Sequence, residues 1–135
     1  MKNYKISYKE KLGVVYSCKY RVVWCVKYLR PVLLDDVSVR LHEIIRSVAA
    51  ECDLEIMGVK IWPDHVSLLI EIDPQMGIHK IIKLIKNRSS GLIRSEFDAI
   101  KTRVPTLWTN NYFVTTEGYV SDEVVSQFIE QQKHV

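Results

Sequence analysis

The chain has 135 residues, of which 47% are hydrophobic and 26% charged, a composition typical of one globular domain and not of a disordered or fibrous polypeptide. No apolar run approaches the ~18 residues that a membrane span needs, and no signal-peptide core is present, so the sequence predicts a cytoplasmic protein. Cys18, Cys25 and Cys52 form no CxxC pair, so we expect buried free thiols and neither a disulfide framework nor a zinc site. The net charge of +3 indicates solubility and no particular partner.

The first half of the chain predicts a strand, a helix and a hairpin. Residues 14–26 are rich in β-branched and aromatic side chains and predict one long strand that ends before Pro31. Apolar residues at three- and four-residue spacing then predict a helix that Asp35 or Asp36 caps and that runs to about Glu51. Two short strands, 54–61 and 66–72, follow on either side of a Trp-Pro-Asp turn and predict an antiparallel hairpin.

The second half predicts a helix, a strand and a final helix. From Ile78 onward, isoleucines and leucines share one side of a helix, while lysines and an arginine line the other side as a cationic stripe. Residues 107–114 predict a last strand that Gly118 ends. Ser121 is expected to cap a closing helix whose acidic first turn suits the positive helix N-terminus.

The order β-α-β-β-α-β-α predicts the fold class α+β. We expect a single domain over residues 1–135 with a ferredoxin-like antiparallel sheet, helices on one face, and a terminal helix that need not belong to the core.

Positive charge is concentrated in two segments. Residues 1–30 carry eight Lys or Arg against one acid, and residues 80–103 carry seven against two, whereas the rest of the chain is acidic. Cations for phosphates and flat rings for unstacked bases are what a nucleic-acid surface needs. A solvated surface with aromatic residues in the core remains the alternative at this point. The aromatic residues interleaved with the basic ones are Tyr16, Tyr20, Trp24, Tyr28 and Trp108.

His65 and Ser67 are predicted to share one face of a strand, because side chains alternate between the two faces. Two histidines at this spacing would give a divalent metal two imidazole ligands, but serine is a much weaker ligand. On the last helix, Phe128 and Gln132 are four residues apart and lie on the same side. By themselves, the histidine is compatible with a structural role and the glutamine with an exposed one.

Five ordered blocks of the chain resemble one family. The blocks are YSCKYRVVWCVKYLRPVL (16–33), WPDHVSLLIEIDP (62–74), KLIKNRSSGLIRSEF (83–97), LWTNNYFVTTEG (107–118) and FIEQQ (128–132). They are similar to the small single-tyrosine transposases of the histidine-hydrophobic-histidine (HUH) type, the transposase A of bacterial and archaeal insertion sequences that move as single-stranded DNA. The resemblance implies a ferredoxin-like core, an obligate homodimer, and binding of single-stranded DNA and of imperfect DNA hairpins at the element ends.

The resemblance also implies a mechanism. In this family, two histidines and a glutamine bind Mg²⁺ or Mn²⁺, which polarises the scissile phosphate. A helix tyrosine, commonly supplied by the other subunit, attacks the phosphate to form a 5′-phosphotyrosine and a free 3′-hydroxyl, so strands are rejoined without ATP.

The family's site residues are only partly present. By this resemblance His65 matches the first metal-binding histidine and Gln132 the helix glutamine, but Ser67 stands at the second histidine and Phe128 at the nucleophilic tyrosine. Phenylalanine has no oxygen with which to attack phosphorus, so we expect a weakened metal site and impaired or absent cleavage.

Three alternatives remain open. One is a working enzyme in which Tyr119 or Tyr112 replaces the nucleophile, although nine residues of helix separate Tyr119 from Phe128 by about 13 Å. Another is a catalytically inactive, domesticated DNA- or RNA-binding regulator. The third is an RNA-binding module with no cleavage history, although no RNP motif is present.

The DNA contacts are expected to come from both basic segments and to weaken steeply with salt. The predicted DNA-binding residues are Lys19, Arg21, Lys27, Arg30, Lys80, Lys83, Lys86, Arg88 and Arg94.

Overall fold

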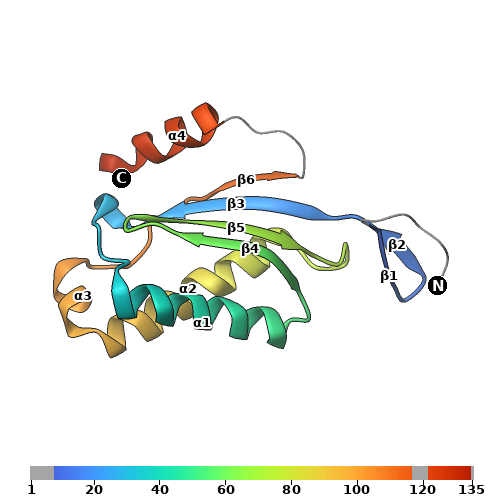
Figure 1. Cartoon of the computed structure of the whole chain (residues 1–135), viewed down its shortest axis with the longest axis horizontal. Helices are drawn as coiled ribbons and strands as arrows, with labels where there is room; N and C mark the ends of the chain where they lie inside the picture. The colour runs from blue at the N-terminus through green and yellow to red at the C-terminus, as the bar shows by residue number, and fades with distance from the viewer. Residues whose placement is uncertain (1–7, 117–121, 135) are drawn as a thin grey trace.

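The computed structural model describes residues 8–116 and 122–134 (Figure 1). Its elements, in chain order, are β1 (Lys9–Lys11), β2 (Val14–Tyr16), β3 (Lys19–Cys25), the 3-10 turn η1 (Lys27–Leu29), α1 (Asp35–Glu51), β4 (Glu55–Ile61), β5 (His65–Glu71), α2 (Ile78–Glu96), α3 (Asp98–Arg103), β6 (Phe113–Thr116), α4 (Asp122–Glu130) and the 3-10 turn η2 (Gln131–His134).

The main sheet confirms the predicted fold class. Its four strands lie in the order β4-β5-β3-β6, and every neighbouring pair is antiparallel. The connections β3-α1-β4 and β5-α2-β6 each carry the chain over the same face, which is the ferredoxin-like arrangement. Figure 1 shows α1 and α2 together beneath the sheet and α4 above it. The last helix therefore lies on the side of the sheet opposite α1 and α2. We call this side, which α1 and α2 do not cover, the open face.

Alternation along the strands decides which side chains enter the core. Val22 and Trp24 of β3 and Leu68 and Ile70 of β5 are fully buried in the cluster beneath the sheet. Isoleucines and leucines at helical spacing on α1 and α2 pack against them, as the periodicity predicts. The residues that alternate with these core residues along each strand point to the open face, and His65 is one of them. Hydrophobic burial therefore sets the orientation of the site residues.

The predicted strand 14–26 is wrong at its first half. The chain leaves the main sheet before Lys19, and β2 pairs instead with β1 in a separate two-stranded ribbon, which projects from the sheet in Figure 1. Leu12 and Gly13 join these strands with φ values of 51° and 83°, the positive pair that a tight hairpin turn requires. Ser17 lies at this break, but one serine between two segments suited to strands is only a weak turn signal, so the sequence pattern did not indicate the change of pairing partner.

Smaller differences concern the helix ends. The residue that precedes α1 is Leu34, and no side chain caps the helix, so the predicted aspartate cap is wrong. The short helix α3 was not predicted. Gly118 and Ser121 lie outside the described residues. All three cysteines are free, but only Cys25 is buried, and no helix within the described part of the chain is long and apolar enough to cross a membrane.

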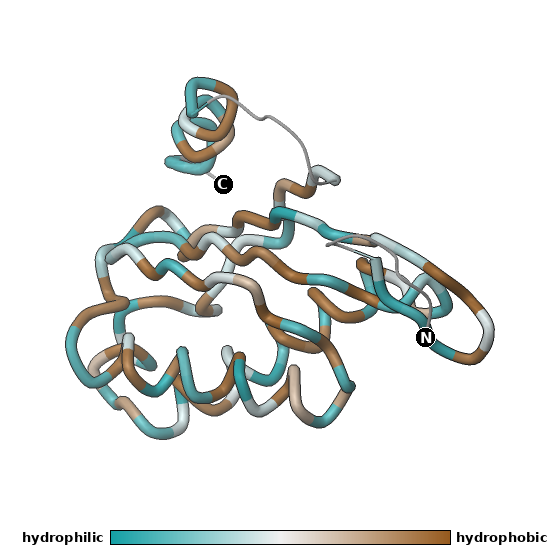
Figure 2. Tube along the Cα trace, turned by 45° about the vertical axis from the view of Figure 1, so that its right-hand side comes forward, coloured by the Kyte–Doolittle hydropathy of each residue, from teal (hydrophilic) through white to brown (hydrophobic). Residues whose placement is uncertain are grey.

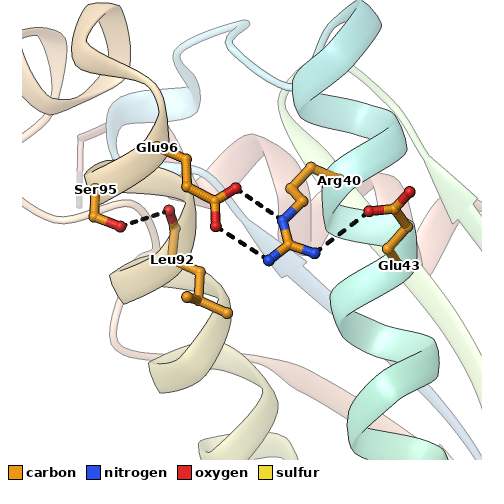
Figure 3. Close-up of polar contacts among 5 residues, drawn as sticks. All are labelled: Arg40, Glu43, Leu92, Ser95 and Glu96. Carbon is orange, nitrogen blue, oxygen red and sulfur yellow. Dashed lines mark hydrogen bonds and ion pairs between the residues drawn. The ribbon is translucent and has the colours of Figure 1, made fainter.

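An ion-pair cluster joins α1 to α2 (Figure 3). Arg40 donates from Nε to Glu96 at 2.8 Å and from Nη2 to the same carboxylate at 3.1 Å. Its Nη1 also donates to Glu43 one turn further along α1, at 3.3 Å. Both helices also pack on the sheet, so these exposed ion pairs link the two helices at the surface of the helix layer.

Candidate active site on the open face of the sheet

The central strands place the two predicted metal-site residues side by side. In the register, His65 of β5 is opposite Cys25 of β3, and Ser67 is opposite Val23. Both residues are half-buried and face away from the core. The predicted shared face is confirmed by the alternation along β5. Figure 2 shows the helix near the C-terminal end of the chain on one side of the sheet and the two long helices on the other.

The imidazole of His65 is held in one orientation. Its Nδ1 lies 2.7 Å from Oδ1 of Asp64, and since a carboxylate only accepts, the proton of this hydrogen bond is on Nδ1, which in the neutral imidazole leaves the lone pair on Nε2. The indole of Trp62 stacks on the ring with centroids 4.4 Å apart and planes within 8°. A histidine fixed by a carboxylate at one nitrogen is the usual arrangement of a metal ligand.

Gln132, the other predicted metal-site residue, has a buried and oriented side-chain amide. It is 2% exposed, and its Nε2 donates to the backbone oxygen of Phe128 at 3.0 Å. Its Oε1 is buried and has no hydrogen-bond partner among the described residues. Buried amide oxygens normally have a partner, so this atom is suited to accept a metal ion or a donor from a ligand.

The turn η2 lies near the end of the sheet at which β5 begins with His65. The turn η2, which contains Gln132, contacts η1, and η1 follows β3 almost directly after Cys25, the register partner of His65. The backbone N–H of Val26 also donates to the backbone carbonyl oxygen of Asp64 at 2.9 Å. In Figure 1 the C-terminal end of α4 lies over this end of the sheet.

Phe128, which the sequence resemblance matches to the family's tyrosine, packs on the open face of the sheet. Its ring is tilted against Phe113, with centroids 5.8 Å apart, and Phe113 is the register partner of Val23 on the same face as Ser67. Tyrosine has the same ring shape, so packing does not require phenylalanine here.

The side chains present fit a divalent metal only in part. His65 and Gln132 offer a nitrogen and an oxygen in fixed orientations, and the Ser67 hydroxyl is a weak third donor. Cys25 does not add a thiolate, because burial and then the nearby Asp64 raise its pKa to about 12. Within the described part of the chain, no group of three or more His, Cys, Asp or Glu side chains is arranged to hold a metal.

Tyr112 is directed away from this site. It precedes β6 by one residue, so it falls on the opposite side from Phe113, and its hydroxyl lies 2.9 Å from Nδ1 of His79 on α2. The other alternative nucleophile, Tyr119, lies outside the described residues. The described geometry therefore offers no hydroxyl of tyrosine at the position of Phe128.

The predicted DNA-binding residues are scattered over different environments. Lys80 and Lys83 of α2 and Arg30 after η1 are exposed, and Arg21 of β3 is half-buried on the open face. Lys27 lies 5.1 Å from the centre of the Tyr28 ring. Arg94 is half-buried, and its Nε has no hydrogen-bond partner in the described chain.

Three predicted DNA-binding residues are placed unfavourably for direct contact. Lys19 is buried. Arg88 donates to Glu51 of α1 at 2.5 Å, so its charge is neutralised within the helix layer. Lys86 is 8% exposed, and its ammonium donates to the backbone oxygens of Thr109 at 2.7 Å and Asn111 at 2.8 Å. Burial lowers the pKa of Lys86 to about 8. This lysine ties α2 to the segment before β6.

A cavity of about 410 Å³ lies beside this lysine, between α2 and residues 106–112. The exposed Lys83 and the rings of His79, Tyr112 and Trp108 contribute to its walls. Part of the predicted cationic stripe therefore borders an aromatic cavity on the helix side of the sheet.

The predicted interleaving of cations and aromatic rings is mostly a feature of the core. Trp24 is fully buried, Trp108 is nearly so, and the two rings meet edge to face. Among the described Phe, Trp and Tyr residues, Tyr8, Tyr28 and Trp62 are exposed. The core alternative thus holds for both tryptophans of the predicted interface.

Lys60 is a basic residue of the open face that sequence reasoning missed. It lies on β4 opposite Ser67. It belongs to a segment that is acidic overall, so the distribution of charge along the chain did not indicate a basic surface there. Strand alternation together with the hairpin register would have found it.

Comparison with known proteins gives a consistent result over nearly the whole chain. The family described as "Transposase IS200 like" matches residues 14–132. The ISDra2 transposase TnpA of Deinococcus radiodurans is 32% identical over 126 residues, which are 92% of this chain and 90% of that protein. The IS200 transposase of Salmonella typhimurium is 26% identical over 105 residues, which are 76% and 69% of the two chains.

Solved structures agree with the fold. A crystal structure of a Deinococcus radiodurans R1 protein assigned as a transposase superposes with a TM-score of 0.86 at 32% identity, covering 94% of this chain and 99% of that one. A REP-associated tyrosine transposase, solved with a REP hairpin bound, superposes with a TM-score of 0.58 at 12% identity, covering 98% and 76%. At that identity the second structure supports the fold alone.

Proposed function

Because the chain belongs to the IS200-like transposase family, we propose that it binds the single-stranded and hairpin ends of an insertion sequence and that its own strand cleavage is impaired. The observation that carries this proposal is the contrast within the candidate site. His65 and Gln132 keep the orientation of ligands, whereas Phe128 and Ser67 lack the groups that the family's chemistry uses.

The metal site is proposed to be weak but retained. His65 would hold Mg²⁺ or Mn²⁺ through Nε2 and Gln132 through its buried Oε1, with the Ser67 hydroxyl or water in the remaining positions. When bound, such an ion stabilises negative charge that develops on a phosphate oxygen. Asp64 and Trp62 keep the imidazole oriented whether or not the ion is present.

The missing step is nucleophilic attack. A tyrosine at residue 128 would form a bond from its oxygen to phosphorus while the bond from phosphorus to the 3′-oxygen breaks. Phe128 occupies the same volume against Phe113 but carries no oxygen. Binding and metal loading can therefore persist without covalent chemistry.

The proposed partners are DNA hairpins and a second copy of the chain. The REP-associated transposase, whose fold this chain shares, was solved with a REP hairpin bound, and the proposal extends hairpin binding to this chain. The exposed Lys80 and Lys83 provide cations for a DNA backbone on the helix side of the sheet. The homodimer is a family expectation that the mass of the purified protein in solution would test.

The test uses a labelled DNA hairpin with a single-stranded flank, incubated with the protein and Mn²⁺. We expect saturable binding and no covalent adduct on a denaturing gel. A covalent protein–DNA adduct would overturn the claim of impaired cleavage. Equal or tighter binding to an RNA of the same sequence would favour the RNA-binding alternative.

A further inference from the structure

A groove of about 560 Å³ crosses the open face beside the candidate active site. Side chains from all four strands of the main sheet and from the first turn of α4 line it. The residues that matter for its chemistry are Arg21, Lys60, Ser67, Leu69, Thr116 and Asp122.

The two cations of this groove form no ion pair with another described residue, although Asp122 also lines the groove. No ion pair or hydrogen bond joins the side chain of Arg21 or Lys60 to another described residue. Other basic side chains in the molecule do have acidic partners: Lys9 pairs with Glu55, Lys11 with Asp53 and Asp73, and Arg88 with Glu51. Unpaired cations that line a groove on a sheet face indicate a site for an anionic ligand.

The register places these cations around residue 67. Lys60 of β4 lies directly opposite Ser67 of β5. Arg21 of β3 lies opposite Leu69, the next residue along β5 on the same face. Strands are about 4.8 Å apart, so the long side chains of Lys60 and Arg21 can reach a group that lies over Ser67 from two sides.

We propose that Arg21 and Lys60 bind a phosphodiester group of single-stranded DNA in this groove, and that this binding does not require a divalent metal. The inference rests on the proposed function and names the residues that hold the strand. The guanidinium of Arg21 and the ammonium of Lys60 would pair directly with the phosphate and so supply positive charge beside residue 67, where the family has a second metal-binding histidine. The Ser67 hydroxyl is placed to donate to the same phosphate.

Asp122 allows a test in which a substitution should strengthen DNA binding instead of weakening it. Its carboxylate lies at the groove on the first turn of α4 and repels a phosphate that Arg21 and Lys60 attract. Asp122→Asn should therefore tighten DNA binding, by about twofold to threefold at low salt. Unchanged or weaker binding by this variant would count against a phosphate in the groove.

The main experiment measures fluorescence anisotropy of a labelled oligothymidylate in EDTA at several salt concentrations. We expect wild-type binding, and for the double variant R21Q/K60Q we expect about tenfold weaker binding and a log–log salt slope shallower by about 1.4, the value for two phosphate contacts in a single strand. Arg46→Gln is the matched control, because Arg46 is an exposed residue of α1, on the other side of the sheet. It should change neither quantity.

The outcomes separate this inference from the proposed function. A wild-type protein that binds neither oligothymidylate nor hairpin DNA contradicts both. Binding that EDTA abolishes, or that R21Q/K60Q leaves equal to the Arg46→Gln control, overturns the inference and leaves the proposed function standing. Circular dichroism of R21Q/K60Q confirms that any loss of binding is not a loss of folding.

Discussion

The helix layer and the open face of the sheet use basic side chains in opposite ways. In the helix layer, Arg40 and Arg88 are held by carboxylates of the neighbouring helix, and Lys86 is buried against backbone oxygens. On the open face, Arg21 and Lys60 line a groove without an acidic partner in the described chain. The basic residues of the helix layer therefore hold parts of the protein together, whereas Arg21 and Lys60 are available to a ligand.

This difference shows why the density of charge along the chain is a poor guide to a binding surface. Lys86 and Arg88 lie in a strongly basic segment, yet their charges are satisfied internally. Lys60 lies in an acidic segment, yet it faces the candidate site. The useful quantity is the charge that remains without a partner on one surface, which only the fold reveals.

The largest expected effect is a gain of chemistry on the open face. The double variant F128Y/S67H should form a covalent adduct with a labelled DNA hairpin in Mn²⁺, where the wild type forms none, because it regains an attacking oxygen and a second imidazole. A denaturing gel measures the adduct. The control is Phe113→Tyr, which adds a hydroxyl on the ring that packs against residue 128. An adduct with this control would show that position 128 is not the required one.

A large loss of stability is expected when the buried cation of the helix layer is removed. Lys86→Met should lower the free energy of unfolding by about 1–3 kcal/mol, because the carbonyl oxygen of Thr109 is buried and loses its donor. Urea denaturation at pH 7 measures this change. A stability equal to that of the wild type would contradict the role of Lys86 as a tie between α2 and the segment before β6.

The same lysine predicts how stability depends on pH. Burial lowers the folded pKa of Lys86 to about 8, below its ordinary value of 10.5. Between these values the unfolded chain binds the proton and the folded chain does not, so stability contributed by this group rises as pH increases from about 8 to about 10. Cys25, whose pKa is raised, acts in the opposite direction above about pH 9 but is present in both proteins. The free energy of unfolding of the wild type should therefore increase relative to that of Lys86→Met across this range. A parallel rise in both proteins would assign it to another group.

A moderate effect is expected from the exposed lysines of α2. Neutralising both, in K80Q/K83Q, should weaken hairpin binding by about threefold to tenfold at low salt and leave unfolding unchanged. Anisotropy with a labelled hairpin measures this. Lys101→Gln, on the short helix α3, is an equally exposed control. If this control weakens binding as much as K80Q/K83Q does, the effect is one of net charge and not of the α2 surface.

The smallest expected effect concerns the ion pairs between the helices. Arg40 and Glu96 are both substantially exposed, so Arg40→Ala should lower the melting temperature by only about 2 °C, and less in high salt. Thermal unfolding of Arg40→Ala, Glu96→Ala and the double variant measures the coupling. A loss as large as that of Lys86→Met would show that this exposed cluster, and not burial, holds the helix layer.

Local patterns were sufficient for most of the fold. Apolar spacing placed α1 and α2, and the Trp-Pro-Asp turn placed the β4–β5 hairpin, because these elements depend on neighbours close in sequence. The separate ribbon of β1 and β2 was missed, since residues 14–26 are uniformly suited to a strand and pairing partner is a tertiary choice. The alternation on β5 correctly brought His65 and Ser67 to one face.

The sequence alone determined that this chain resembles a transposase in which Phe128 and Ser67 stand at two positions of the family's chemistry, because the identity of a side chain decides whether an attacking oxygen exists. Only the tertiary structure decided which cations are available. Lys86 became a buried tie, Arg88 an ion pair, and Lys60 a neighbour of Ser67. Burial and pairing arise from contacts between residues far apart in the chain, so no count along the sequence contains them.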